Sequence, residues 1–544
     1  PTATVTPTPT PTPTTTATAG GLSVQVKVSS DWGTGRSMEL LVTNASNSAI
    51  SSWTVAMPWA GSASGMWNAK GGAANGVLSA ANESWNGSLA PGATASVGFS
   101  DAGTLTIPAT CTATVSGKSG TCALNGAGQT SPSPTTTATP TVTATPTASA
   151  TPTATTTPTP APTASTPGGT ATLGDRKVVG YFTAWSTYAR NYQVTDIPGN
   201  KVSHINYAFA NVANGKCVLG DSYADIDKAF AGDTWDTGVL RGNFNQLVKL
   251  RAKNPNLKTL ISIGGWTWSA NFSAAAATDA SRKAFASSCV DFMKQYKFDG
   301  VDIDWEYPVS GGLQSGSPAD KANYTALLQE FRNQLNAKET ADSRDYLLTI
   351  AAPAGPSIIN NLEPAKIAVA TDWINLMSYD YHGGWDATTG HNAPLAQGAA
   401  DPSPTGWSVS ETVDAYLAAG VPAGKLVVGV PFYGRGWTTT GTANAGLFQA
   451  GTGASVGTWE SGVFDYSDIA KNYLPTMTRY WDADAKVPYL YDPARKLFIS
   501  YDDPESIAAK AAYINSKGLG GAMFWEFSGD RNQVLLDALN ATLD

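Results

Sequence analysis

The sequence has few residues of the types that hold metals or phosphate groups. It contains only 3 histidines among 544 residues, and none lies at a metal-ligand spacing from another. Charged residues make up 14% of the chain and its net charge is −8, whereas nucleic-acid binding needs clustered lysine and arginine. No apolar run has the length of a membrane span. We therefore expect no metal or other cofactor, no nucleic-acid partner and no membrane anchor.

Cysteine is also scarce. The four cysteines fit a secreted protein with one or two disulfides, or equally a reduced protein with buried thiols. Cys217 and Cys289 either pair with each other or remain free thiols. The chain begins at Pro1 without a visible signal peptide, which predicts a processed form or a fragment.

Two segments consist almost entirely of proline, threonine and alanine. They are residues 1–19, "PTATVTPTPTPTPTTTATA", and residues 128–173, which include "TATPTVTATPTASATPTATTTPTP". Segments of this composition have too few apolar side chains to form a core. They are predicted to be extended spacers whose hydroxyls are open to O-glycosylation. The spacers favour secretion, and they separate two segments that fold, residues 20–127 and 174–544.

Residues 20–127 alternate apolar and polar side chains with a period of two, as in "LSVQVKV" and "SWTVAMPW". Short strands separated by Gly, Asn and Ser turns predict a β-sandwich. Trp53 lies within a strand and is expected in the core. Trp32, Trp67 and Trp85 instead lie beside small polar turn residues, as in "SDWGTG" and "ESWNGSLAPG".

This segment resembles a family 2 carbohydrate-binding module, notably at "VTNASNSAISSWTV" and "SWNGSLAPGATASVGFS". The resemblance implies that Trp32, Trp67 and Trp85 form a flat platform on a polysaccharide; the alternative is that they are scattered structural residues. Such modules usually join a cysteine near each end. Here the pair is Cys111 and Cys122, for which we expect a local disulfide, and the choice between chitin and cellulose as ligand stays open.

Residues 174–544 alternate apolar strand-like runs with helical stretches. Eight candidate strands are "KVVGYFT", "KVSHINYAFA", "LKTLISIGG", "FDGVDIDWE", "YLLTIAAP", "DWINLMSYD", "KLVVGVPFYG" and "GGAMFWEF". Eight strand–helix units predict a (β/α)8, or TIM, barrel. Between the last two strands, residues 438–511 contain further strand-like segments such as "RYWDADAKVPYLYD", so we expect an inserted α+β subdomain there. The whole chain is thus predicted to be multidomain.

The fourth candidate strand lies in "FDGVDIDWEYP", residues 298–308, which is unusually acidic. Asp302, Asp304 and Glu306 share one face because side chains two apart in a strand point the same way. That face should line the barrel interior, with Glu306 nearest the C-terminal mouth, where barrel active sites lie. Asp299 breaks the alternation and is expected at the strand entry.

Crowded carboxylates raise at least one pKa, which keeps a carboxylic acid protonated near neutral pH for use as a general acid. The alternative is a salt-bridged or calcium-bound strand. Calcium usually takes oxygens from a loop, so the strict alternation of this segment fits that alternative poorly.

"DGVDIDWE" matches the DxxDxDxE motif of glycoside hydrolase family 18, the chitinase family. The further motifs "SIGGW", "MSYDYHG", "GVPFYGRGW" and "GGAMFWE" also occur in the chain order of that family. Residues 174–544 most resemble the bacterial chitinases with an insertion domain. The resemblance implies a secreted, endo-acting enzyme that hydrolyses β-1,4 bonds between N-acetylglucosamine units. It also implies retention of configuration, with the N-acetyl group of the substrate as nucleophile.

The resemblance assigns four catalytic residues. Glu306 would protonate the glycosidic oxygen, and Asp304 would turn toward Glu306 or the acetamido group. Asp302 would share a proton with Asp304, and Tyr379 would bind the acetamido carbonyl. Trp525 would form the floor of the −1 sugar site, with Trp266 and Trp385 on the leaving-group side. The full set of implied substrate-binding or supporting residues is Tyr181, Ser262, Gly265, Trp266, Met377, Asp380, Trp385, Tyr433, Arg435 and Trp525.

Two other functions fit the same motifs. A chitinase-like lectin would bind sugars without cutting them, but such relatives typically lose the catalytic Glu or a neighbouring Asp, and here both are present. An endo-β-N-acetylglucosaminidase of this family would act on N-glycans or peptidoglycan, whereas Trp266, Trp385 and the insertion favour a long homopolymer. The expected partners are chitin and its oligosaccharides, with cellulose as a further candidate for the N-terminal module. We expect a monomer.

Overall fold

The computed structural model describes residues 21–31, 35–67, 69–82, 86–102, 108, 110–115, 118–126, 176–236, 238–314 and 316–543. The chain divides into two compact units, Pro1–Thr151 and Pro152–Asp544. Both predicted spacers, residues 1–19 and 128–173, lie outside the described residues. Trp32 and Trp85 also lie outside them, as does the side chain of Trp67, so the predicted platform stays a prediction.

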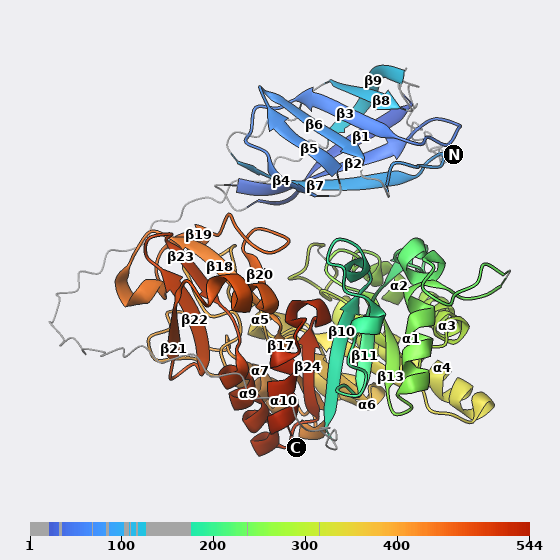
Figure 1. The fold of residues 1–544 in the computed structure, drawn as a ribbon. Coiled ribbons are helices and arrows are strands. Elements are labelled where there is room, and N and C mark those ends of the chain that lie inside the picture. The colour runs from blue at the N-terminus through green and yellow to red at the C-terminus, as the bar shows by residue number, and fades with distance from the viewer. Residues whose placement is uncertain are drawn as a thin grey trace, which may run out of the picture. The chain divides into compact units, whose positions relative to one another are not determined.

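The first unit is the predicted β-sandwich (Figure 1). Its strands run in the hydrogen-bonded order β4-β7-β2-β1-β9-β8-β3-β6-β5. Alternate residues of these strands are buried together, and Trp53 is among them as predicted; its indole Nε1 donates to the carbonyl of Asn86 at 2.9 Å. The strands are β1 Leu22–Asp31, β2 Gly35–Asn44, β3 Trp53–Pro58, β4 Ser64–Trp67, β5 Ala69–Ala74, β6 Val77–Asn82, β7 Thr94–Ala102, β8 Cys111–Val115 and β9 Lys118–Gly126.

The cysteines take two different states. Cys111 and Cys122 face each other on β8 and β9, with Cα atoms 5.3 Å apart, and form a disulfide. Cys217 and Cys289 are both buried and free. The second pairing left open by the sequence is therefore not made in this structure, and the disulfide joins two neighbouring strands rather than the ends of the module.

The second unit contains the predicted barrel. Eight parallel strands pair with their neighbours, and pairing of β10 with both β11 and β24 closes the ring. The last strands of the barrel lie beside the first in Figure 1. The barrel strands are β10 Lys177–Thr183, β11 His204–Ala213, β13 Lys258–Gly264, β14 Gly300–Asp304, β15 Leu347–Ala352, β16 Trp373–Leu376, β17 Leu426–Pro431 and β24 Gly521–Trp525, with β12 Lys216–Val218 forming a hairpin with β11.

Helices surround the barrel strands. The α-helices are α1 Gly242–Lys253, α2 Phe272–Ala276, α3 Asp279–Gln295, α4 Asp320–Asp342, α5 Pro356–Ile359, α6 Pro364–Ala370, α7 Val409–Ala418, α8 Tyr466–Asp468, α9 Pro504–Lys517 and α10 Val534–Thr542. Single turns of 3-10 or π helix are η1 Ala184–Thr187, η2 Val194–Asp196, η3 Tyr223–Asp227, η4 Ala423–Lys425, η5 Ala443–Gly446, η6 Ile469–Tyr473 and η7 Phe527–Asp530. Among the described helices, none combines the length and apolar character of a membrane span.

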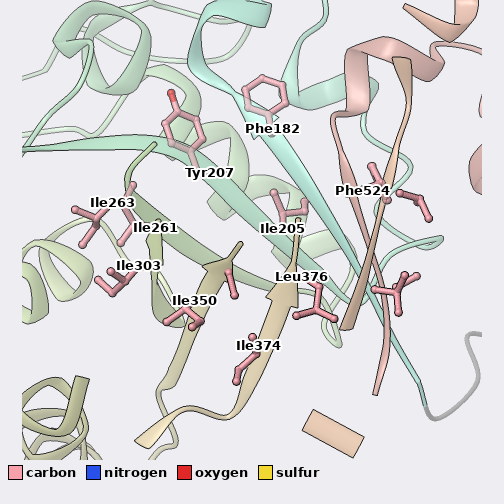
Figure 2. Close-up of a cluster of buried hydrophobic side chains, with 14 of the residues drawn as sticks. Phe182, Ile205, Tyr207, Ile261, Ile263, Ile303, Ile350, Ile374, Leu376 and Phe524 are labelled. Atoms are coloured by element: carbon pink, nitrogen blue, oxygen red, sulfur yellow. The ribbon is translucent and has the colours of Figure 1, made fainter. Parts of the chain in front are cut away.

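The outward face of each barrel strand supplies the main core. Figure 2 shows part of this cluster, with Ile261 and Ile263 on β13, Ile303 on β14 and Ile350 on β15. Side chains at alternate positions of a strand point to opposite faces. Burial of these branched residues against the helices therefore forces the residues between them into the barrel interior.

A second sheet follows β17 and forms the insertion. Its main path is β19-β18-β23-β22-β21, with β20 paired to β18, and Trp437, Tyr489 and Phe498 lie in its core. Its strands are β18 Tyr433–Thr439, β19 Gly451–Gly453, β20 Val463–Asp465, β21 Thr478–Asp482, β22 Val487–Asp492 and β23 Leu497–Ser500. The sheet begins at Tyr433, before the expected start at residue 438, because β17 already ends at Pro431.

Candidate active site

The acidic residues of β14 point into the barrel. Val301 and Ile303 are fully buried in the outer core, and Asp302 and Asp304 occupy the intervening inward positions. The strand ends at Asp304, so Glu306 lies just beyond it, half-buried at the C-terminal end, rather than within it as the alternation suggested. Asp299 lies immediately before the strand and is paired with Arg251 at 2.5 Å and Arg344 at 2.6 Å.

Asp302 accepts four side-chain hydrogen bonds. Its Oδ2 receives the hydroxyls of Tyr181 at 2.7 Å and Ser262 at 2.8 Å. Its Oδ1 receives Thr349 Oγ1 at 2.5 Å and Asn375 Nδ2 at 3.4 Å. Burial raises the pKa of Asp302, and these donors oppose the rise by stabilising the carboxylate. Thr349 and Asn375 were not identified from the sequence, although their inward positions on β15 and β16 were a usable signal.

Asp304 has a different environment. It is 3% exposed, and its Oδ1 has no hydrogen-bond partner in the described part of the protein. Burial and the nearby charges of Glu306 and Asp302 raise its pKa well above the ordinary value. Burial also raises the pKa of Glu306 to about 7. Adjacent carboxyl groups with such different partners are suited to different protonation states.

Asp380 is the centre of a second polar group. Its backbone has a φ of 57°, which is uncommon for a residue other than glycine. Oδ1 accepts from Tyr433 Oη at 2.7 Å and from Arg435 Nε at 2.8 Å, and Oδ2 accepts from Arg435 Nη2 at 2.6 Å. Both partners lie on β18, so the insertion sheet contributes directly to the site. The Arg435 guanidinium also lies 5.0 Å from the ring centre of Trp385.

Trp525 ends β24 and belongs to an aromatic cluster at the same end of the barrel. Its ring centre lies 5.4 Å from that of Tyr181, 5.8 Å from that of Phe209 and 6.3 Å from that of Trp185. The stacked Phe209 and the exposed Trp185 were not identified from the sequence. Met377 and Tyr379 pack against the same cluster, and the Tyr379 hydroxyl lies 3.9 Å from Met523 Sδ.

Two tryptophans expose large apolar faces to solvent near these groups. Trp266 is 46% exposed and Trp385 is 61% exposed. The ring centre of Trp266 lies 6.5 Å from that of Tyr307, the residue after Glu306. Gly265 precedes Trp266 with a φ of 81°, and a Cβ atom there would lie 2.7 Å from the Phe209 ring. Its amide donates to the carbonyl of Asp304 at 2.8 Å, which fixes the two strand ends together.

The histidines lie outside this arrangement. His204 packs against Trp373, and burial lowers its pKa to about 4. His382 bonds Asp386, and His391 bonds Asp482. No three His, Cys, Asp or Glu residues within the described ranges are grouped so that they could hold a metal ion. The chemistry available here is that of a carboxylic acid protonated near neutral pH, beside buried carboxyl groups, a tyrosine and an aromatic surface.

Comparison with known proteins agrees with this geometry. Residues 177–530 match the family described as glycosyl hydrolases family 18, and residues 22–122 match the family described as cellulose binding domain. The chain is 52% identical to Chitinase A1 of Niallia circulans over 408 residues, which are 68% of this chain and 58% of that relative. It thus spans little more than half the length of that protein.

Two further relatives are matched over a larger share of their own length. Chitinase C of Streptomyces lividans is 35% identical over 92% of this chain and 90% of its own length. The solved structure of chitinase ChiA74 from Bacillus thuringiensis is 43% identical, with a TM-score of 0.66 over 68% of this chain and 70% of that one. Because the family match covers more than half of the chain and includes all eight barrel strands, this chain belongs to glycosyl hydrolases family 18.

Proposed function

We propose that this protein is an endo-acting chitinase that cleaves β-1,4 bonds between N-acetylglucosamine units with retention of configuration. The observation that carries the proposal is the file of Asp302, Asp304 and Glu306 at the barrel mouth, in which burial raises the pKa of Glu306 to about 7. The relatives named as chitinases support the substrate class. Trp266 and Trp385 expose faces on which sugar rings of a polymer can stack.

Protonated Glu306 donates its proton to the glycosidic oxygen, which lets the leaving sugar depart as an alcohol. The acetamido oxygen of the substrate attacks the anomeric carbon and forms an oxazolinium ion. Tyr379 orients the acetamido group. Asp304 passes the proton that it shares with Asp302 to that residue, and its carboxylate then stabilises the positive charge that develops on the acetamido group. The carboxylate form of Glu306 then takes a proton from water, which attacks the anomeric carbon from the face that the leaving group left. This attack opens the oxazolinium ring and gives retention of configuration.

The remaining polar groups hold these residues in place. Asp302 is fixed by Tyr181, Ser262, Thr349 and Asn375, and it stands directly beneath Asp304 on β14. Asp380, held by Tyr433 and Arg435, binds hydroxyls of the distorted sugar. Trp525 supports the apolar face of the same sugar, since aromatic rings and sugar faces pack well together.

The N-terminal module holds the enzyme on insoluble polysaccharide, and we propose that the protein acts outside the cell. The match to a cellulose binding domain supports the first statement. The two proline- and threonine-rich spacers and the Cys111–Cys122 disulfide support the second, since disulfides persist in oxidising compartments.

The product profile from chitin hexaose tests the reaction class, the anomeric outcome and the cleavage mode together. We expect internal cleavage into dimer, trimer and tetramer, with β-anomers at the new reducing ends within the first minutes. Early products read by mass spectrometry and by proton NMR measure both. Initial α-anomers would contradict retention, and faster release of glycans from a high-mannose glycoprotein than of sugars from chitin would favour an endo-β-N-acetylglucosaminidase.

The pH dependence of kcat should show an alkaline limb near the pKa of Glu306. The general acid must be protonated, and burial raises its pKa to about 7. We therefore expect kcat to be maximal below pH 7 and to fall about tenfold per pH unit well above it. Initial rates on a chitin oligosaccharide from pH 4 to 10 measure this, with the melting temperature followed in parallel. A constant kcat up to pH 9 would contradict Glu306 as the acid.

A further inference from the structure

The segment that follows Glu306, described at residues 309–314 and 316–317, folds back onto the backbone of that residue. A Cβ atom built at Gly312 would lie 2.0 Å from the carbonyl oxygen of Glu306 and 2.7 Å from the amide nitrogen of Tyr307. Such distances do not occur between a real Cβ and a backbone atom. The main chain at Gly312 therefore lies in direct contact with the peptide group of Glu306, and any shift of this segment moves or releases that group.

Asp320 holds the segment. It is the first residue of α4, is 1% exposed, and is not among the residues identified from the sequence. Its Oδ2 accepts the backbone amides of Ser317 at 2.7 Å and Val309 at 3.4 Å, and its Oδ1 accepts the Ser273 hydroxyl at 2.7 Å. Gly316 also lies close, since a Cβ atom there would be 2.1 Å from Asp320 Oδ2.

The backbone that Asp320 holds is strained. Val309 has a φ of 69°, in the left-handed region that β-branched residues rarely adopt. Its carbonyl accepts from the Gly316 amide at 3.0 Å, while its own amide points at Asp320. Strained residues persist only where the surroundings over-determine them. Val309 lies three residues after Glu306, and the carboxylate of Asp320, which accepts its amide, helps to hold it in this conformation.

We propose that Asp320 is a positioning residue for Glu306, acting through Val309, Gly316 and Ser317 and through the contact of Gly312 with the Glu306 peptide group. The inference rests on the proposed function, because it concerns the residue proposed there as the acid. A general acid must stand within hydrogen-bond reach of the oxygen it protonates, and a misplacement of about 1 Å costs on the order of 100-fold in rate. The hydrogen bonds of Asp320 go to Ser273, Val309 and Ser317, none of which is proposed to touch the substrate.

The first test compares Asp320→Asn with Asp279→Asn in the full chain. Asn keeps the size of Asp320 but leaves one acceptor oxygen for three donors. We expect kcat on chitin hexaose to fall about 10- to 100-fold with KM changed less than about twofold. The alkaline limb of the pH profile of kcat should also move. A displaced Glu306 lies at different distances from Asp304 and Asp380, and this changes its pKa. Asp279 also begins a long helix, but its side chain is 71% exposed and pairs with Lys283, so its variant should behave as wild type.

The second test uses Gly312→Ala, which leaves Asp320 intact and displaces the same peptide group. Gly355→Ala is its control, because a Cβ atom there meets nothing within 4 Å. We expect Gly312→Ala to reproduce the loss of kcat and the shifted alkaline limb, and the double variant with Asp320→Asn to lose less than the product of the two single losses.

A role of Asp320 in stability alone would lower the melting temperature and leave the pH profile of the folded enzyme unchanged. Wild-type alkaline limbs in both Asp320→Asn and Gly312→Ala would therefore overturn the inference, whatever their stability. A wild-type protein inactive on chitin oligosaccharides would instead overturn the proposed function, so the two failures are distinct.

Discussion

Glu306→Gln is expected to lower kcat on chitin oligosaccharides by about 10⁴-fold while leaving their affinity nearly unchanged. The amide has the size of the acid but cannot donate a proton to the glycosidic oxygen. Burial raises the pKa of Glu306 to about 7, so the native residue is largely protonated at mildly acidic pH and meets the substrate as a neutral group. Replacing one neutral group by another of the same shape should therefore preserve ground-state binding and remove only the chemical step.

The measurement combines initial rates on chitin hexaose with a binding titration followed by tryptophan fluorescence. Glu363→Gln is the matched control, because Glu363 lies at the start of α6 and forms an ion pair with Lys366. Its variant should keep the wild-type rate. Turnover of Glu306→Gln within tenfold of wild type would show that another group is the acid. A large loss of affinity would mean that the carboxyl also holds the substrate before reaction.

Asp304→Asn is expected to lower kcat by about 10²- to 10³-fold with little change in KM. Asp304 is buried with one oxygen unpartnered in the described structure, and its pKa is raised well above the usual value by burial and by Glu306 and Asp302. A carboxyl group in that state gains most from a neighbouring positive charge. The proposed oxazolinium ion supplies that charge only as the reaction proceeds, so the loss should fall on the chemical step.

Asp299→Asn is a control from the same acidic stretch, and we expect it to change stability rather than kcat. Asp299 is paired with Arg251 and Arg344 at the entry of β14, away from the mouth. Its replacement should lower the melting temperature, since it removes a buried carboxylate that pairs with the half-buried Arg251 and the exposed Arg344, and it should leave kcat of the folded enzyme near wild type. Rates and thermal unfolding curves of both variants separate the two effects. An Asp304→Asn enzyme with wild-type kcat would contradict the role proposed for that carboxyl.

The architecture followed from local patterns in the sequence. The two spacers, the period-two alternation of residues 20–127 and the eight apolar runs of residues 174–544 each depend on near neighbours along the chain. The same is true of the inward file in β14, because Val301 and Ile303 must be buried against helices and so turn Asp302 and Asp304 inward. Glu306 departed from the pattern because the strand ends at Asp304.

Other parts of the site depend on which strands become neighbours. Thr349 and Asn375 reach Asp302 from β15 and β16, Phe209 reaches Trp525 from β11, and these contacts follow from strand order and register around a closed ring. The insertion sheet likewise brings Arg435 onto Asp380. Motif resemblance named Arg435 and Asp380, but their pairing is a property of the assembled sheets.

The sequence by itself thus determined the domain order, the barrel and the identity of the acidic file, since alternation and composition act over a few residues. Tertiary structure alone decided which donors hold Asp302 and that Asp320 fastens the segment packed on Glu306. These depend on contacts between residues far apart in the chain. Hydrogen bonds and burial act over a few ångströms in space, and a linear pattern does not contain those distances.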